Sequence, residues 1–355
     1  MEIVEIDPGD RSALRDFVAV ANAARRADSP WVHPLTEHEA EGRLRHGWDL
    51  DPTVAFLATV RGRPVGLAEY ETSGYDNHHL AWVRFDVHPD HRRRGHGSAI
   101  LAALLERARA EGRTTVGTDG WEHAAATGFA SRHGLECRSR EIQRRQVLAG
   151  LDRSRLDRLH AEATERAAAY ELARLAGPVP EEELEAFAVM VAAINDSPVD
   201  DLDLEDEVYS PRRIRAYEEA HRLRGVRIHR LYARHRGTGE LAGETIVGVD
   251  AERPQLGEQH DTSVVRAHRG HRLGLLLKLE MLRWLQDEEP QLESIDTWNA
   301  ESNHHMIAVN DALGYQVLGR ALLFQTSVGA APAPTARAGA APTAGQDSGQ
   351  GAASP

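Results

Sequence analysis

The chain carries an internal repeat whose period is about half its length. Three short motifs occur twice, in the same order and at nearly one spacing. The pairs are His91-Arg92 with His268-Arg269 and Asp119-Gly120-Trp121 with Asp296-Thr297-Trp298, both offset by 177 residues, and Asp28-Ser29-Pro30 with Asp196-Ser197-Pro198, offset by 168. Three collinear pairs indicate a duplication, and a period this long means two copies of one domain rather than a solenoid.

Apolar periodicity and turn signals predict the same order of elements in both copies. In the first copy we expect strands at 3–6, 55–60, 65–71, 80–87, from 114 and near 142–148, and helices at 10–27, 97–110 and 123–133. In the second we expect strands at 170–175, 226–234, 241–249, 262–265, 294–298 and 317–325, and helices at 181–194, 273–286 and 303–313. An antiparallel hairpin inside this order indicates a mixed α/β fold of α+β type rather than a doubly wound sheet.

These elements divide the chain into four parts. We expect a first lobe at 1–150, a linker at 151–168 with a charged helix over 154–168, and a second lobe at 169–326. From about Gly329 the chain is rich in Ala, Pro and Gly and has no large apolar residue. Such a segment cannot bury enough surface to offset its ordering entropy, so 327–355 is predicted to be a disordered tail.

Composition excludes several classes of protein. The net charge of −13 argues against non-specific nucleic-acid binding. The single cysteine, Cys137, cannot form an internal disulfide or a Cys-rich metal site, and no His pair has a recognised metal-ligand spacing. No secretory signal or long apolar run is found. We therefore expect a cytoplasmic protein with no metal, nucleic-acid or membrane partner, and its oligomeric state stays open.

A glycine- and arginine-containing loop between a strand and a helix, residues 87–98, is typical of an anion site. Backbone N–H groups at a helix start are unpaired, and the helix dipole favours a negative ligand there. Gly95 and Gly97 allow close approach of backbone to a ligand. A basic solvated loop is the alternative, but the same strand, His-Arg and helix unit at 264–274 favours ligand binding in both copies.

These residues resemble a known family. Arg92-x-x-Gly95-x-Gly97 after a strand is similar to the acetyl-CoA signature of the GNAT N-acetyltransferase superfamily, Q/R-x-x-G-x-G/A. The second copy keeps Arg269 and Gly274 but has Arg272 where the family usually has Gly. The later segments 297–303 and 313–315 resemble the family motif in which an Asn opens the last helix and a Gly-aromatic pair follows it. The resemblance covers about 1–326 and implies two tandem GNAT folds, each with a splayed mixed sheet flanked by helices.

The resemblance also implies where the co-substrate acetyl-CoA would bind. In that fold the fourth and fifth strands separate, the pantetheine arm bonds the exposed edge of the fourth strand, and the pyrophosphate lies on the loop and helix start. The positions that match in the first copy are Val87, Arg92, Arg93, Arg94, Gly95, His96, Gly97 and Ser98. Those in the second copy are Val264, Arg269, Gly270, His271, Arg272, Leu273 and Gly274, with Asn303 on the last helix.

Both copies depart from the family pattern. The family's tyrosine that protonates the departing thiolate is replaced by Ala130 and Asn310, and neither residue is a general acid. The first copy lacks the Asn of the later motif, whereas the second has the substituted loop. The complete loop favours the first copy as the acetyl-CoA binder, and binding by both copies stays open.

The chemistry requires a base, because an amine with a pKa near 10 is only ~0.1% neutral at pH 7. Strand positions offer Glu69, Asp86 and His79 in the first copy and Glu244 and Asp261 in the second. Each has the alternative interpretation of a solvated charge at a strand end. The acidic run 200–207 would attract a cationic amine or would be a solvated loop. Three tryptophans could line an acceptor pocket, although large aromatic side chains more often pack in a core. They are Trp31, Trp48 and Trp82.

The sequence thus predicts an N-acyltransferase that moves acetyl from acetyl-CoA to an amine by direct attack on the thioester. A small molecule such as an amino sugar, an amino acid or an antibiotic is the expected acceptor, and a protein N-terminus or lysine is the alternative acceptor. A non-catalytic acyl-CoA-binding or regulatory protein is the rival hypothesis, which the missing tyrosine supports. One active lobe with the other as a scaffold is compatible with the first hypothesis.

Overall fold

A computed structural model of the chain describes residues 1–329 and contains one continuous mixed sheet of twelve strands in the order β1-β2-β3-β4-β5-β12-β6-β11-β10-β9-β8-β7. The expected tail, 327–355, lies outside the described residues except for its first three. Of these, Ser327 ends the last strand, and Val328 is buried and donates its N–H to the carbonyl of Thr114. The ordered second lobe therefore reaches slightly past 326.

The two copies have matching elements. Those of the first lobe and the linker are β1 (Glu2–Glu5), α1 (Arg11–Asp28), α2 (Glu37–His46), β2 (Val54–Val60), β3 (Arg63–Glu71), β4 (Leu80–Val87), α3 (His96–Ala110), β5 (Thr115–Trp121), α4 (Ala124–His133), β6 (Glu136–Val147) and α5 (Arg153–Arg166). Those of the second lobe are β7 (Tyr170–Ala176), α6 (Leu184–Val191), η4 (Ala192–Asp196), α7 (Pro211–Leu223), β8 (Val226–His235), β9 (Leu241–Asp250), β10 (Leu256–Val264), α8 (Leu273–Glu288), β11 (Ser294–Ala300), α9 (His304–Ala312) and β12 (Gln316–Ser327).

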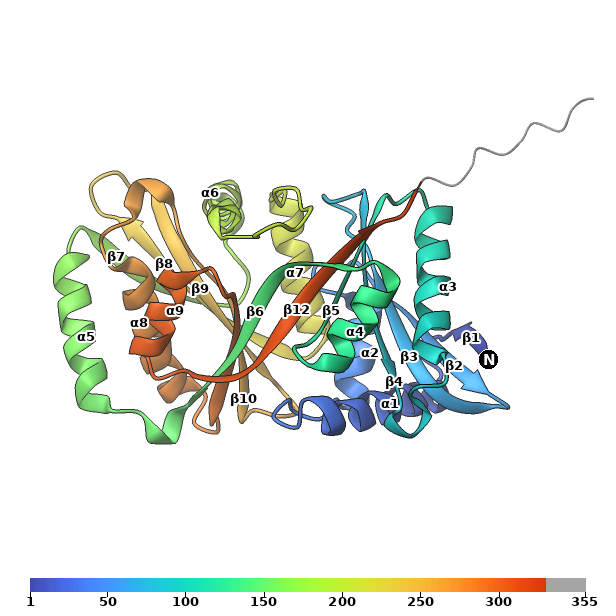
Figure 1. Ribbon diagram of the computed structural model, residues 1–355. Coiled ribbons are helices and arrows are strands. Elements are labelled where there is room, and N and C mark those ends of the chain that lie inside the picture. Colours follow the sequence, from blue (N-terminus) through green and yellow to red (C-terminus); the bar gives the residue numbers. More distant parts are fainter. Residues whose placement is uncertain (330–355) are drawn as a thin grey trace, which may run out of the picture.

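The two lobes exchange their last strands, which Figure 1 shows crossing at the centre of the molecule. Strand β12 of the second lobe pairs antiparallel with β5 of the first, where Ala321 faces Trp121. Strand β6 of the first lobe pairs antiparallel with β11 of the second, where Gln143 faces Trp298. Strands β6 and β12 also pair with each other. Each half of the sheet is thus completed by the other lobe.

Each half of the sheet opens between its two parallel strands. Strands β4 and β5 are paired only from Leu80 to Val83, so β4 has a free edge beyond that point. Strands β10 and β11 are paired only from Leu256 to Glu258. A register shift between Gln259 and Thr262 marks a β-bulge in β10, a feature that re-aims side chains and is common near functional sites.

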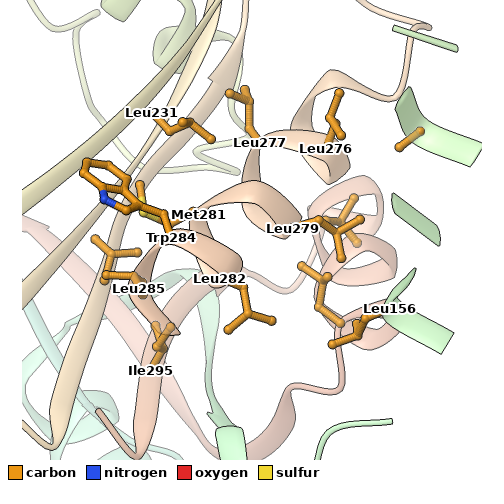
Figure 2. Packing of buried hydrophobic residues seen from close by; sticks show 14 of the residues in the cluster. Leu156, Leu231, Leu276, Leu277, Leu279, Met281, Leu282, Trp284, Leu285 and Ile295 are labelled. Atoms are coloured by element: carbon orange, nitrogen blue, oxygen red, sulfur yellow. The ribbon is translucent and has the colours of Figure 1, made fainter. Parts of the chain in front are cut away.

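Helix α8 forms the core of the second lobe. Its residues Leu277, Met281 and Leu285 are almost completely buried, and Figure 2 shows α8 with apolar side chains on both its strand side and its α5 side. Leu156 lies on α5, which is the linker helix, and packs against α8. In the first lobe α3 covers the sheet through Ile100 and Leu104. The linker thereby becomes part of the second lobe's core.

Two helices and the first halves of two strands differ from the sequence expectation. Strand β10 begins at Leu256, whereas the sequence predicted a strand only over 262–265. Helix α2 is absent from the expected elements because its sequence, EHEAEGRLRH, has an apolar stripe of only Ala40 and Leu44. Helix α7 has several charged residues and a Pro at its start, and it packs on α2 of the other lobe. Strand β6 begins at Glu136 rather than near 142 because its polar first half lies in the sheet centre.

The strand exchange predicts that the lobes are not separable. A fragment of residues 1–150 leaves the edge of β5 open and β6 without either neighbour, which exposes unpaired backbone groups. We expect fragments 1–150 and 151–355 each to be unfolded or aggregated alone and to form one folded heterodimer when co-expressed. Size-exclusion chromatography and circular dichroism measure this; a monomeric 1–150 fragment with cooperative thermal unfolding would contradict it.

Candidate functional site

The two loops that precede α3 and α8 share one backbone shape. Each has two residues with positive φ, at equivalent positions: Arg93 (61°) and Gly95 (84°) in the first, Gly270 (88°) and Arg272 (55°) in the second. Each loop therefore places Gly at one left-handed position and Arg at the other. A left-handed non-glycine residue costs about 1–2 kcal/mol, which is tolerable once per loop. The substitution at Arg272 thus leaves the loop shape unchanged.

Both loops present free backbone N–H groups at a helix start. Neither helix has a side-chain cap at its N-terminus, where Gly95 and Arg272 are the N-cap residues. Within residues 1–329, the N–H groups of 93–98 and 270–275 find no backbone acceptor. Such a nest of N–H groups, with the helix dipole behind it, suits a pyrophosphate. Gly97 lies close to a neighbouring ring, since a Cβ there would be 3.3 Å from Phe129.

One ion pair holds each loop in place. The guanidinium of Arg92 donates to both carboxylate oxygens of Asp28 (2.8 and 2.6 Å) and through Nε to the carbonyl of Val87 (3.0 Å). In the second lobe Arg269 donates to Asp196 (2.6 Å) and to the carbonyl of Val264 (3.0 Å). These arginine side chains are engaged within the protein, so a bound phosphate would meet the loop through backbone rather than through Arg92 or Arg269.

The free strand edges lie next to these loops. The N–H of His88 donates to Val65 on β3, so by alternation the N–H of Val87 points to the opposite edge, where β5 has diverged. The N–H of Val265 likewise donates to Ala242 on β9, and Val264 faces the gap between β10 and β11. Both valines thus occupy the edge that the sequence assigned to a pantetheine arm.

A partly open cavity lies on the α6–α7 side of the second lobe, next to the bulge in β10. Its floor is formed by strand residues Arg230, Glu244, Ile246 and Asp261, and its walls by α6, the segment before α7 and α7 itself. The first lobe completes it with Trp48 and Asp49. This cavity is therefore built by both lobes.

Two carboxylates on the cavity floor lack full compensation. Glu244 is completely buried, and neither of its carboxylate oxygens has a hydrogen-bond partner among the described residues. Arg230 lies 3.6 Å away through Nε, and its Nη1 is likewise without a partner in that range. Burial, followed by the charges of Glu207 and Glu244, raises the pKa of Asp261 to about 7. Asp261 thus changes charge near neutral pH, as a general base must.

The cavity opens to solvent beside the half-exposed Trp48 and Glu207, and the buried Arg213 holds this end, which is the cavity mouth, in place. Arg213 of α7 donates to Asp49 (2.6 Å) and Asp76 (2.6 Å), both from the first lobe, and to Glu207 (2.8 Å). One guanidinium therefore joins three carboxylates from three separate segments. Trp48 lies over an aromatic cluster, with ring centroids 5.7 Å from Tyr217 and 4.7 Å from His260.

Comparisons with known proteins agree with this geometry. The family model "Acetyltransferase (GNAT) family" matches residues 19–135. A solved structure described as a tandem GNAT protein from the clavulanic acid biosynthesis pathway is 27% identical, covers 93% of this chain and 99% of its own, and superposes with a TM-score of 0.75. Residues 19–135 thus form a GNAT acetyltransferase domain, and the whole described chain has the fold of a tandem GNAT protein. The two halves of the sheet are its two GNAT lobes.

Curated relatives match shorter stretches. The mycothiol acetyltransferase of Nocardiopsis dassonvillei is 40% identical over 98 residues, which is 28% of this chain and 28% of that protein. The mycothiol acetyltransferase of Amycolatopsis mediterranei is 36% identical over 137 residues, or 38% of this chain and 40% of that protein. The chain thus spans well under half the length of these relatives in each match.

The expected base candidates of the first GNAT lobe have different surroundings from those of the second. Glu69 is buried in an ion pair with Arg43. Burial, followed by the charge of Asp28, raises the pKa of Asp86 to about 6. His79 pairs with Asp203 (3.4 Å) at the start of β4, whereas the strands separate at the other end, so the structure removes it from the acceptor cleft.

The acidic run 200–207 is neither a free loop nor only a charged attractant. It crosses the sheet of the first lobe: Asp200 accepts from Ser139 (2.5 Å), and Asp203 accepts from Thr115 (2.7 Å). Its end, Glu207, reaches the cavity. The run therefore ties one wall of the second lobe's cavity to the first lobe.

The later family motif has a structural role in both lobes. Asn303 is the N-cap of α9 and accepts from the N–H of Met306 (3.1 Å), and His123 caps α4 in the same way through Ala126 (3.1 Å). Asn310, at the tyrosine position, accepts from buried Lys278 (2.8 Å) and is itself completely buried. Burial lowers the pKa of Lys278 to about 7.

Several cavity residues were not singled out from the sequence: Asp49, Tyr209, Arg213, Tyr217 and Arg230. Glu207 was part of the acidic run 200–207 that the sequence analysis named. Alternation along β8 and β9 could have placed Arg230 and Glu244 on one face, because the register sets Arg230 opposite Ile246 and Glu244 opposite Tyr232. No local sequence pattern could have predicted the ion pair between Asp49 and Arg213, because these residues are 164 positions apart. For Trp48 the sequence left open pocket lining and core packing, and the structure places it in the lining of this cavity.

Residues 1–329 contain neither a candidate membrane helix nor a metal-binding cluster. No helix in this range has both the length and the apolar character to cross a bilayer. No group of three or more His, Cys, Asp or Glu side chains in the same range is arranged to hold a metal ion.

The raised pKa of Asp261 predicts a pH-dependent effect on stability. Its folded pKa of about 7 lies above the ordinary 3.8, so ionisation opposes folding progressively as pH rises from about 4 to 7. An asparagine side chain at this position cannot ionise, so Asp261→Asn should stabilise the fold by on the order of 2–3 kcal/mol more at pH 8 than at pH 5. Thermal unfolding at the two pH values measures this, with Asp206→Asn as the exposed control; equal Tm changes at both would contradict it.

Proposed function

We propose that the second GNAT lobe transfers an acetyl group from acetyl-CoA to an amine bound in the cavity. The observation that carries this proposal is Asp261, which lies on a bulge of β10 at the point where β10 and β11 separate. The acyl donor would end at this same gap. The names of the curated relatives support acetyl as the transferred group.

Asp261 acts as the base in this proposal. An ammonium acceptor must lose a proton before it attacks, and a carboxylate with a pKa near 7 is deprotonated at working pH while still holding a proton well enough to remove it. Glu244 on the next strand lines the same cavity; burial raises its pKa, and an ammonium bound beside it would favour its charged form. Arg230 limits the repulsion between the two carboxylates.

The loop and the strand edge would hold acetyl-CoA. The free N–H groups of residues 270–275 suit the pyrophosphate, and the edge of β10 at Val264 suits the pantetheine amides. Bound acetyl-CoA supplies the thioester carbon that the amine attacks. N–H groups of the same edge are placed to stabilise the charge that develops on the acyl oxygen.

The first lobe serves as a scaffold in this proposal. Three of its carboxylates are paired, Glu69 with Arg43 and Glu71 and Asp119 both with Arg84. Asp86 has no ion pair within residues 1–329, and burial raises its pKa to about 6, so it is the base to test if the first lobe proves catalytic. The first lobe also supplies Trp48 and Asp49 to the cavity of the second lobe. Its own loop has the same shape and free N–H groups, so we expect it to bind acyl-CoA without turning it over.

Asp261→Asn should lower kcat by about 10²- to 10⁴-fold, because the amide cannot accept the proton. In the wild type, kcat should rise with pH through about 7 as Asp261 loses its proton, and this rise should disappear in the variant. Thiol release from acetyl-CoA with a panel of small amines measures both. An unchanged pH profile in Asp261→Asn would exclude Asp261 as the base, and no thiol release from any amine would support the non-catalytic alternative.

Loop-blocking variants assign the working lobe. Gly274→Trp should abolish thiol release, because the bulky ring would occupy the start of α8 where a Cβ has only Val264 nearby (3.9 Å) among the described residues. Gly97→Trp, its matched counterpart at the start of α3, should remove one acyl-CoA site from a calorimetric titration while thiol release persists. Loss of turnover in Gly97→Trp alone would instead make the first lobe the catalytic one.

A further inference from the structure

The mouth of the cavity carries more negative charge than its arginines neutralise. Arg213 is shared by Asp49, Asp76 and Glu207, so this cluster has one positive and three negative groups. On the floor, Arg230 faces Glu244, and within residues 1–329 no arginine lies at ion-pair distance from Asp261. The charged groups that line or brace the cavity therefore have a negative excess even after one carboxylate serves as base.

We propose that the acceptor carries a second cationic group, which binds at the cavity mouth between Glu207 and Asp49 while its reacting amine meets Asp261. This proposal rests on the acetyl transfer proposed above. The acceptor class is a compact diamine or a sugar or amino acid with a second basic group. The first lobe supplies part of this second subsite, through Asp49 and Trp48.

Unsatisfied groups support a ligand in this place rather than a merely acidic surface. Glu244 is completely buried, both of its oxygens lack a hydrogen-bond partner in the described part of the chain, and it lines the same cavity. A buried polar group without a partner costs free energy, which a bound ammonium would recover. Asp49 and Glu207 share Arg213 with Asp76, and burial raises the pKa values of Asp49 and Glu207 despite this shared ion pair.

Aromatic side chains complete the second subsite. Tyr209 donates its hydroxyl to Glu207 (3.0 Å) and lines the cavity. Trp48 is 43% exposed, so part of its ring is accessible at the mouth. The face of an aromatic ring attracts a cation, and this attraction is strongest for tryptophan. A second ammonium would thus be held by two carboxylates and by aromatic faces.

The reaction balances without a further reactant. The reacting ammonium gives one proton to Asp261, and the neutral nitrogen forms a C–N bond with the acetyl carbon as the C–S bond breaks. The nitrogen then releases its second proton, and the departing thiolate takes up one proton to leave CoA as the thiol. The second cationic group keeps its proton throughout, so the products are CoA and a mono-acetylated cation.

The test compares 1,4-diaminobutane with 4-aminobutan-1-ol, which has the same length but a single ammonium. Thiol release gives kcat/KM for each, and calorimetry in the presence of CoA gives each Kd. We expect the diamine to be favoured on the order of 10- to 100-fold in both quantities, as for a hydrogen-bonded charge pair. Glu207→Gln should bring the ratio close to one, whereas Asp206→Asn, its exposed neighbour, should leave the ratio unchanged.

A second variant tests the second cation site if Glu207→Gln does not fold. Arg213 keeps its ion pairs with Asp49 and Asp76 when Glu207 is replaced, so we expect Glu207→Gln to fold. A thermal unfolding measurement on this variant checks that expectation. If that variant is unstable, Trp48→Leu leaves the ion cluster intact and should still lower the diamine preference.

The outcomes separate this proposal from acetyl transfer itself. Equal kcat/KM for the diamine and the amino alcohol would overturn the second cation site and leave the transferase proposal standing. Tighter binding of the diamine without thiol release would support the site and contradict the transferase proposal. Neither selective binding nor thiol release would overturn both.

Discussion

Backbone hydrogen bonds between β6 and β12 determine the architecture of this chain, because each of these strands belongs by sequence to one lobe and by pairing to the other. Strand β12 completes the sheet beside β5, and β6 completes it beside β11. Twelve strands thereby form one sheet. Since neither half can close its sheet alone, the two lobes have one fixed orientation, and a site that uses residues from both becomes possible.

The cavity of the second lobe depends on that orientation. Arg213 reaches Asp49 and Asp76 only because α7 packs against the first lobe, and Trp48 meets His260 for the same reason. A buried guanidinium with three carboxylates is stable only while all its partners stay in place, since removing one partner of a buried pair leaves an uncompensated charge. The first lobe therefore shapes this cavity both through its position and through the side chains of Trp48 and Asp49.

The sequence predicted the parts of the fold that are local or repeated. Two of the repeated motifs prove to be the two ends of one contact, because Asp28 pairs with Arg92 and Asp196 with Arg269. Strand β4 and the start of α8 were predicted correctly from apolar patterns. The strand exchange was not predictable, because β6 has the same local pattern whichever lobe it pairs with. The Arg213 cluster joins segments over 130 residues apart, for which one sequence contains no signal.

Differences in charge compensation, rather than in the loops, distinguish the two lobes. The sequence favoured the first lobe for its complete glycine pattern, yet the backbone shows that both loops need two left-handed residues and that one glycine in either position is sufficient. The substitution at Arg272 is therefore no argument against the second lobe. Glu69 in the first lobe is paired with Arg43, although Asp86 there has no ion pair within residues 1–329. In the second lobe Glu244 has Arg230 nearby but no hydrogen-bond partner for either carboxylate oxygen in the same range, and Asp261 has no ion pair there. A carboxylate that the fold pairs internally contributes to stability, whereas a buried one without a hydrogen-bond partner costs free energy, and this cost is the physical basis for the cationic acceptor proposed for the second lobe.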